Sequence, residues 1–412
     1  MLIILNSSKL LMFSLVAYVF FIPISTALMN LFLYLALILI VLSKDLIKNI
    51  KESWKNHASK FSILFFLFVI LGSLWSIGSY EDIIDGISTY KKFIFIFLML
   101  PFLIERKNNE LLIDAFFISM SFILCLVYLI FLDIMQPVNI QLYKGVSLHV
   151  SESGGFKTHI ITNILFAFFG FISIHRFFDS SKARYLLLGL LAFYYSIFIN
   201  DGTTGQILSI SLLSILIIQK YRYKSALILP IALLGILAYG ASNNNTSIYS
   251  AINKIQTGLG DFESGAAVKS VDVRLAMFTN GLIIAGESPW IGTGTGSINQ
   301  SHINNLDKLP STFEHRSKTT NPHSEYLSIA IQYGLLGLLL YLFFIYKLFE
   351  HTRKLPNNFY KNSAQGLLIL ILIGSLGSSI ITDSGEGHFI MLFIAILFAP
   401  LTNQEILKND RP

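Results

Sequence analysis

The chain has 412 residues, of which 54% are hydrophobic and only 13% are charged, and its mean hydropathy is +0.65. A soluble domain carries about 25% charged residues, so the composition excludes a soluble enzyme and a disordered or collagen-like chain and indicates a membrane protein. The single cysteine, Cys125, excludes a disulfide within the chain. The net charge of +6 is therefore assigned first to the two sides of a bilayer, and we expect no nucleic acid partner.

Twelve apolar runs have roughly the length that crosses a hydrocarbon core. The first run follows Lys9 and resembles a signal peptide, but a second run follows at once, so we expect two retained spans. We predict an all-α polytopic membrane protein with about 12 transmembrane helices. The runs are 10–25, 27–43, 61–78, 92–104, 112–133, 158–175, 185–199, 206–219, 225–240, 326–347, 364–381 and 389–403.

The basic residues predict how these spans are oriented. With both termini in the cytoplasm, two thirds of the 30 Lys and Arg fall in cytoplasmic segments, five of them between residues 44 and 60. This is the distribution that the positive-inside rule requires. Most of the positive charge is therefore explained as topological anchoring.

One long outer connection divides the chain into three parts. Residues 1–240 hold helices 1 to 9, residues 241–325 form a long periplasmic loop with short amphipathic helices, and residues 326–412 hold helices 10 to 12 and a short cytoplasmic tail. Long loops in compact proteins tend to be functional, so we expect the catalytic residues in 241–325. Six basic residues remain there against the topological preference, which suggests an anionic ligand: Lys254, Lys269, Arg274, Lys308, Arg316 and Lys318.

The loop contains a first block with helical periodicity. Leu275, Phe278 and Leu282 recur on one face, so that face can lie on the membrane while Arg274 projects from the first turn. The following run at 286–296 is rich in glycine and is expected to be either a plain flexible loop or an exposed backbone that approaches phosphate oxygens.

A second block precedes the tenth span. Asn321 is expected as the helix N-cap and Pro322 as the first helical residue, which places His323 in the first helical turn. The helix dipole would there favour a neutral imidazole and attract phosphate. A structural role for this histidine is the alternative.

Other candidate sites are weaker. The histidines lack the spacing of a metal site, so no metal and no cofactor is expected. Asp383, Glu386 and His388 are interpreted as a solvated cap before the last span. The segment 144–159 either lines a cavity or hydrates its mouth.

The two blocks resemble the signature region of the O-antigen ligase (WaaL) family, whose superfamily includes O-antigen polymerases (Wzy) and PglL-type protein oligosaccharyltransferases. The resemblance covers about 65 residues. It is carried by VRLAM at 273–277, SPWIGTG at 288–294, NPHSEYL at 321–327 and GLLG at 334–337.

The resemblance implies an inverting, metal-independent glycosyl transfer on the periplasmic face of the bacterial inner membrane. The donor would be a glycan on undecaprenyl pyrophosphate, and a ligase would use a hydroxyl of the lipid A core as acceptor. His323 would be the general base or hydrogen-bond partner of that hydroxyl, and Arg274 would bind the pyrophosphate. Asn321 and Glu325, in the same motif, would contribute to substrate binding.

One position departs from the family pattern. Many relatives carry Arg in a G-R-T-G element, and this chain has Thr203 there, within Gly202-Thr203-Thr204-Gly205. Either Lys157, Lys144 or Arg316 replaces this phosphate-binding arginine, or donor binding or activity differs. The open alternatives for the whole chain are a polymerase, a protein oligosaccharyltransferase, which the short tail disfavours, and a flippase or other transporter.

Overall fold

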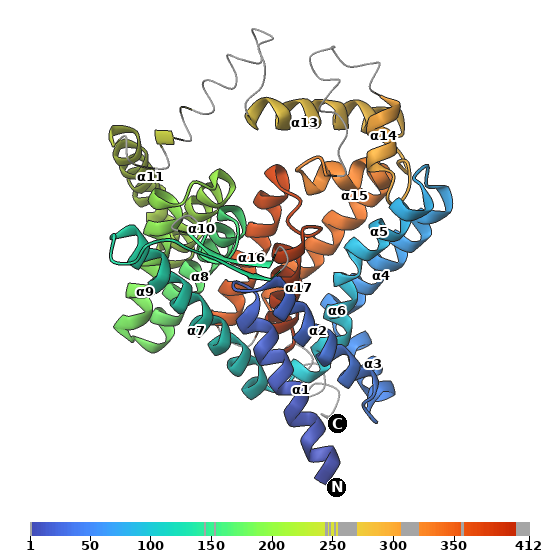
Figure 1. Ribbon diagram of the computed structural model, residues 1–412, viewed down its shortest axis with the longest axis horizontal. Coiled ribbons are helices and arrows are strands. Elements are labelled where there is room, and N and C mark those ends of the chain that lie inside the picture. The colour runs from blue at the N-terminus through green and yellow to red at the C-terminus, as the bar shows by residue number, and fades with distance from the viewer. Residues whose placement is uncertain are drawn as a thin grey trace.

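The computed structural model describes residues 2–143, 146–151, 154–243, 270–305, 321–355 and 358–400, with 246, 249, 250 and 253. These residues are mostly helical (Figure 1). The N-terminal half contains α1 Leu2–Phe21, α2 Thr26–Val41, α3 Leu46–Lys55, α4 His57–Gly72, α5 Tyr80–Tyr90, α6 Lys92–Met99, α7 Arg106–Phe131, β1 Val138–Tyr143, β2 Val146–Val150, α8 His159–Ser180 and α9 Ala183–Tyr194. The remainder contains α10 Thr203–Tyr221, α11 Ser225–Ser242, α13 Ser270–Glu287, α14 Ile298–Asn304, α15 Glu325–Thr352, α16 Asn358–Gly377 and α17 Ser384–Phe398.

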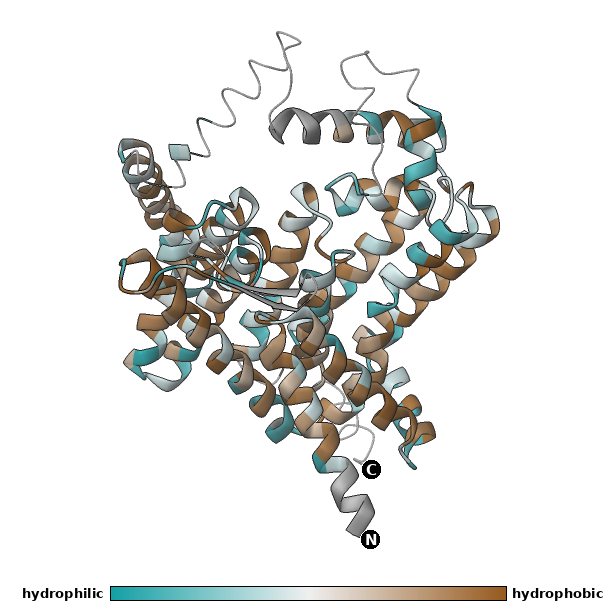
Figure 2. Cartoon of the chain, viewed as in Figure 1, coloured by the Kyte–Doolittle hydropathy of each residue, from teal (hydrophilic) through white to brown (hydrophobic). Residues whose placement is uncertain are grey.

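Each of the twelve predicted spans falls on a helix, but the number of spans stays a prediction. By length and hydropathy, the described residues contain six helices able to cross a membrane, or seven if the bent pair α2 and α3 is one span. Three further apolar helices are shorter: Ser8–Phe21, Ala183–Ile199 and Ser384–Phe398. Figure 2 shows apolar residues along the lengths of the helices and hydrophilic residues gathered near their ends. The chain is thus an all-α type of membrane protein, with one small β-hairpin.

The hairpin β1–β2 was not expected from the sequence, which was interpreted as helices and loops alone. Val138 pairs with Val150 and Ile140 with Leu148 in an antiparallel ladder. The apolar residues alternate with period two here, and that is the pattern of a strand. The segment lies in an outer connection between two long apolar runs, where the sequence predicts a loop.

Two helices form the centre of the molecule. All residues from Thr162 to His175 in α8, and all from Gly385 to Phe398 in α17, are buried. A helix that is apolar all round is buried on every side, and α17 accordingly packs against α4, α6, α7, α8 and α16. The turn that precedes α17 is thereby carried into the interior.

Helix α15 is broken at Gly334, which has φ 60° and ψ −157°. The loop 288–297 binds the backbone groups that the break releases. The amides of Leu335 and Leu336 donate to the carbonyls of Pro289 (2.7 Å) and Trp290 (3.1 Å). Irregular backbone at membrane depth is tolerated where protein covers it, and this loop supplies the cover.

The same loop also binds the end of α4. The amides of Thr293 and Gly294 donate to the carbonyls of Ile331 and Gln332 in α15, at 2.9 and 2.8 Å, while Thr295 donates to Gly72 at 3.1 Å. The glycines permit this close packing, since a Cβ on Gly294 (φ +91°) would lie 2.2 Å from the Cα of Ser76. The prediction of an exposed, phosphate-binding glycine backbone is therefore wrong. The backbone amides of the loop are used inside the fold.

We predict that Gly294→Ala lowers the stability of the folded protein by about 2–4 kcal/mol, because it adds strain at positive φ and a clash with backbone. The thermal unfolding midpoint of the detergent-solubilised protein measures this. Gly286→Ala in α13 is the matched control, since no atom lies within 4 Å of its Cβ position. Equal midpoints for the two variants would show that the loop is not packed as described.

Candidate functional site

The turn 378–383 between α16 and α17 is held by a buried lysine. Lys92, the first residue of α6, is only 4% exposed. Its ammonium donates to the carbonyls of Ile381 (3.2 Å), Thr382 (2.6 Å) and Asp383 (2.7 Å). Three charge-assisted hydrogen bonds satisfy a cation that would otherwise be costly to bury.

A buried carboxylate holds the same turn through its amides. Glu325, the first residue of α15, is fully buried. Its Oε2 accepts hydrogen bonds from the amides of Ile381 (3.1 Å) and Thr382 (3.2 Å) and from the Thr382 hydroxyl (3.2 Å). Lys92 and Glu325 therefore bind opposite polar groups of one turn, and we call this arrangement the Lys92–Glu325 clamp.

His323 does not lie in a helical turn, so that expectation is wrong. The N-cap of α15 is Ser324, whose side chain accepts from the amide of Leu327. Asn321 instead forms a local turn, because its Oδ1 accepts from the amide of His323 at 2.8 Å. His323 has φ 55° in the left-handed region, and the helix begins three residues later than predicted, at Glu325 instead of Pro322.

Asn321 joins this turn to the clamped turn. Its Oδ1 also accepts from the hydroxyl of Ser379 at 2.6 Å, and its Nδ2 donates to Oδ1 of Asp383 at 3.2 Å. The backbone around His323 is thus tied to the turn that Lys92 and Glu325 hold. These contacts fix the position of the His323 backbone, from which the imidazole extends.

His323 lines a cavity of about 280 Å³, which we call the His323 cavity. Its wall comes from the start of α2, the residues around the start of α8, the start of α10, and the connection from α16 into α17. Besides His323 the lining residues are Thr26, Thr158, Ile160, Ile161, Thr204, Gly377, Ser378, Asp383, Ser384, Gly385 and Glu386.

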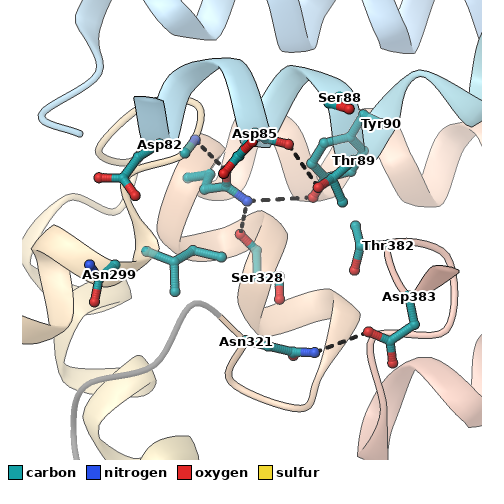
Figure 3. A pocket seen from close by; sticks show the side chains of 14 residues that line it. Asp82, Asp85, Ser88, Thr89, Tyr90, Asn299, Asn321, Ser328, Thr382 and Asp383 are labelled. Atoms are coloured by element: carbon teal, nitrogen blue, oxygen red, sulfur yellow. Dashed lines mark hydrogen bonds between the residues drawn. The ribbon is translucent and has the colours of Figure 1, made fainter. Parts of the chain in front are cut away.

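A larger cavity of about 420 Å³, which we call the Asp85 cavity, also has Asp383 in its wall. Figure 3 shows α5 contributing Asp82, Asp85 and Tyr90, with Asn321 pointing toward Asp383 below them. Asp383 lines both cavities. The other lining residues are Gly86, Ser88, Thr89, Gly296, Ile298, Asn299, Ser328, Gln332 and Thr382.

The acidic and histidine residues before the last span are not a solvated cap, so that interpretation is also wrong. Glu386 is 3% exposed and His388 is 5% exposed. Burial raises the pKa of Asp383, while the Lys92 ammonium acts in the opposite direction. The reason is the central position of α17, which draws its first turn into the protein.

Three other predicted site residues, Thr203, Lys157 and Glu325, can be placed relative to these cavities. Thr203 begins α10 beside Thr204 of the His323 cavity. Lys157 donates to the hydroxyl of Thr26, a lining residue of that cavity. Glu325 lines neither cavity and contacts the turn instead.

Three of the predicted basic residues cannot be placed by their side chains. Arg274 belongs to α13, but its side chain lies outside the described residues. Lys144 and Arg316 lie outside the described residues altogether. Their roles in binding stay predictions.

Sequence reasoning missed Lys92 and the Asp85 cavity. The pair Lys91–Lys92 opens an apolar run on the predicted outer side, where the positive-inside rule disfavours basic residues. That position was the available signal for Lys92. The acidic residues Asp82 and Asp85 carried no comparable signal: acidic residues such as Asp82 are common in the first turns of helices, and Asp85 follows one turn later.

Comparison with known proteins gives one family match. Residues 186–342 match the family model described as O-antigen ligase. The match runs from α9 into α15 and includes Thr203, α13 and His323. No curated protein matches the chain.

We predict that Lys92→Met destabilises the protein by about 3–5 kcal/mol, because it leaves the buried Glu325 carboxylate and three carbonyls without their cation. Thermal unfolding in detergent measures the loss. Lys91→Met is the matched control, since the ammonium of Lys91 contacts the Tyr34 and Ser88 hydroxyls rather than the turn. A control as unstable as Lys92→Met would contradict the clamp.

Proposed function

The chain carries an O-antigen ligase family domain over residues 186–342 and so belongs to the O-antigen ligase superfamily; from this premise we propose that it is an O-antigen ligase of the bacterial inner membrane. It transfers a glycan from undecaprenyl pyrophosphate to a hydroxyl of the lipid A core. The reaction inverts the anomeric centre, needs neither metal nor cofactor, and takes place on the periplasmic face.

The observation that carries this proposal is the His323 cavity. It joins the histidine of the family-like motif to Thr204 of the Gly202–Gly205 element and to the first turn of α17. All of these segments lie at the ends of helices that the charge distribution assigns to the outer side. A lipid-linked pyrophosphate would arrive at this level.

The proposed reaction needs one proton transfer and one leaving group. The oxygen of the acceptor hydroxyl attacks the anomeric carbon while the bond from that carbon to the pyrophosphate oxygen breaks. The lipid pyrophosphate departs with the bonding electrons, and the hydroxyl proton passes to His323. Proton transfer of this kind contributes about 10²- to 10⁴-fold, so stabilisation of the leaving group must supply much of the rest.

Positive charge for the leaving group comes from Arg274 and Lys157. Arg274 is assigned by family resemblance and by its place in α13. Lys157 is assigned because it contacts Thr26 at the wall of the His323 cavity. A guanidinium binds phosphate oxygens in a bidentate manner, and a lysine acts as a point charge.

The alternatives differ in the acceptor and are separated by the product. A polymerase would extend a second lipid-linked glycan, and a protein oligosaccharyltransferase would modify a protein hydroxyl. Reconstituted protein is supplied with undecaprenyl pyrophosphate glycan and either lipid A core or glycan donor alone. Glycosylated lipid A core supports the ligase, whereas a longer lipid-linked glycan assigns the chain as a polymerase. No transfer to any acceptor would overturn the glycosyltransferase proposal and favour a transporter.

We predict that His323→Ala lowers the rate of transfer by about 10²- to 10⁴-fold, because the acceptor hydroxyl loses its proton acceptor. Arg274→Ala is expected to abolish transfer, because the pyrophosphate loses its guanidinium partner. Both variants should remain folded in the membrane. His149→Ala, on the exposed face of β2, is the matched control and should transfer normally, and full decoration of lipopolysaccharide by His323→Ala would refute its catalytic role.

We predict that Lys157→Ala raises KM for the lipid-linked donor about tenfold or more, the loss expected for a hydrogen bond to a charged group. Thr203→Arg should restore donor binding in this variant. A Cβ on Gly202 would lie 3.2 Å from the carbonyl oxygen of His159, so α10 begins beside the segment that carries Lys157. An additive effect of the two substitutions, without rescue, would contradict the replacement of the family's arginine by Lys157.

The pH dependence of donor binding gives a second readout for Lys157. Burial lowers the pKa of this lysine, partly offset by Glu386. The ammonium is therefore lost at a lower pH than in an ordinary lysine, and donor affinity should fall as pH rises through that lowered value. Lys157→Arg should remove this alkaline decline, because a guanidinium stays protonated.

A further inference from the structure

The Asp85 cavity has the lining of a carbohydrate site rather than a phosphate site. Hydroxyl, amide and carboxylate side chains surround it, and the described lining residues include no Lys or Arg. Three carboxylates, from Asp82, Asp85 and Asp383, would repel a pyrophosphate. They would accept hydrogen bonds from a neutral ligand rich in hydroxyl groups. Its volume of about 420 Å³ lies in the range of small-molecule sites.

A buried hydroxyl provides a second, independent observation. Ser328 on α15 lines the cavity although it is only 3% exposed. Within the part of the chain that the structure describes, its side-chain oxygen makes no hydrogen bond; the contact from Gln332 goes to its backbone carbonyl at 3.1 Å. This hydroxyl is therefore available for a ligand in the cavity.

The wall beside Ser328 is held rigid. The Nε2 of Gln332 donates to the Ser328 carbonyl and to the Tyr90 hydroxyl (3.5 Å), while its Oε1 accepts from the amide of Gly296 at 2.8 Å. In Figure 3, dashed lines end at the two labelled partners, Ser328 of α15 and Tyr90 of α5. Polar groups fixed before binding lose little entropy when the ligand arrives.

The position of the cavity relates it to the transfer reaction. Asp383 lines both cavities, and Asn321, two residues before His323, lines the Asp85 cavity and donates to Asp383 at 3.2 Å. We infer that the Asp85 cavity is the acceptor subsite and binds an uncharged sugar ring, with one hydroxyl directed past Asp383 toward the His323 cavity. This assignment rests on the proposed function, because it supposes a donor in the His323 cavity.

The negative charge of the Asp85 cavity also determines which acceptor sugars it binds. Carboxylates hydrogen-bond sugar hydroxyls but repel phosphate and carboxylate groups. The terminal acceptor sugar is therefore one without acidic substituents. The donor differs in carrying the pyrophosphate, for which the His323 cavity offers the Lys157 ammonium at its wall, although Asp383 and Glu386 also line that cavity.

The kinetic test compares two neighbouring carboxylates on α5. Asp85→Asn should raise KM for rough lipopolysaccharide as acceptor by about 10- to 100-fold, the effect of losing a charged hydrogen-bond acceptor, with donor KM changed less than about twofold. Glu81→Gln is the matched control, because Glu81 is exposed in the first turn of α5 and lines neither cavity. An unchanged acceptor KM, or an equal rise in donor KM, would overturn the assignment.

A binding test that needs no turnover separates this inference from the proposed function. In a Cys125→Ser background, Ser88→Cys reports on the Asp85 cavity and Thr204→Cys on the His323 cavity. Rough lipopolysaccharide alone should slow thiol labelling at position 88, and undecaprenyl pyrophosphate alone should slow it at position 204. Lipopolysaccharide that protects only position 204, or neither, overturns the acceptor subsite. Protection at 88 in a protein that transfers no glycan would retain the saccharide site and reject the proposed reaction.

Discussion

The turn 381–383 is held between a buried ammonium and a buried carboxylate, and both cavities depend on its position. Lys92 binds the carbonyls of the turn and Glu325 binds its amides. Each ion is costly to bury alone. Backbone dipoles of this one turn satisfy both of them, the carbonyls for Lys92 and the amides for Glu325. Because Lys92 begins α6 and Glu325 begins α15, the clamp also sets how these two helices meet α17.

Asp383, a residue of the clamped turn, lies in the walls of both cavities. The His323 cavity has Lys157 contacting its wall and is lined by Asp383 and Glu386, whereas the Asp85 cavity is lined by three aspartates and by no Lys or Arg among the described residues. In a glycosyl transfer the two substrates must meet at one bond yet must not exchange places. Under the proposed function, a donor in one cavity and an acceptor in the other would meet at Asp383, so that orientation of the acceptor hydroxyl becomes a property of the fold.

The sequence predicted the helices well and the site only in part. Apolar run length predicted a helix at each of the twelve runs because hydrophobicity is local information, while the number of spans stays a prediction. A short motif singled out His323 and Asn321, which line the two cavities and whose roles stay predictions. The Lys92–Glu325 clamp could not be predicted, because its partner turn lies about 290 residues away from Lys92 in the chain. Gly334 is the residue at which α15 breaks. A glycine in a helix predicts such a break only when the loop that binds the released backbone groups is also known. The packing of the glycines at 292–296 could not be predicted for the same reason, since their packing partners are Ser76 and residues of α5 and α15.

The central claim is that donor and acceptor occupy two cavities that share Asp383 in their walls. Locating the lipid-linked pyrophosphate tests this claim most directly. Cryo-electron microscopy of the protein in nanodiscs with undecaprenyl pyrophosphate would show the phosphates. The account predicts density for them in the His323 cavity, beside His323 and Lys157, with none in the Asp85 cavity. Phosphate density against Asp82 and Asp85, or remote from both cavities, would contradict it.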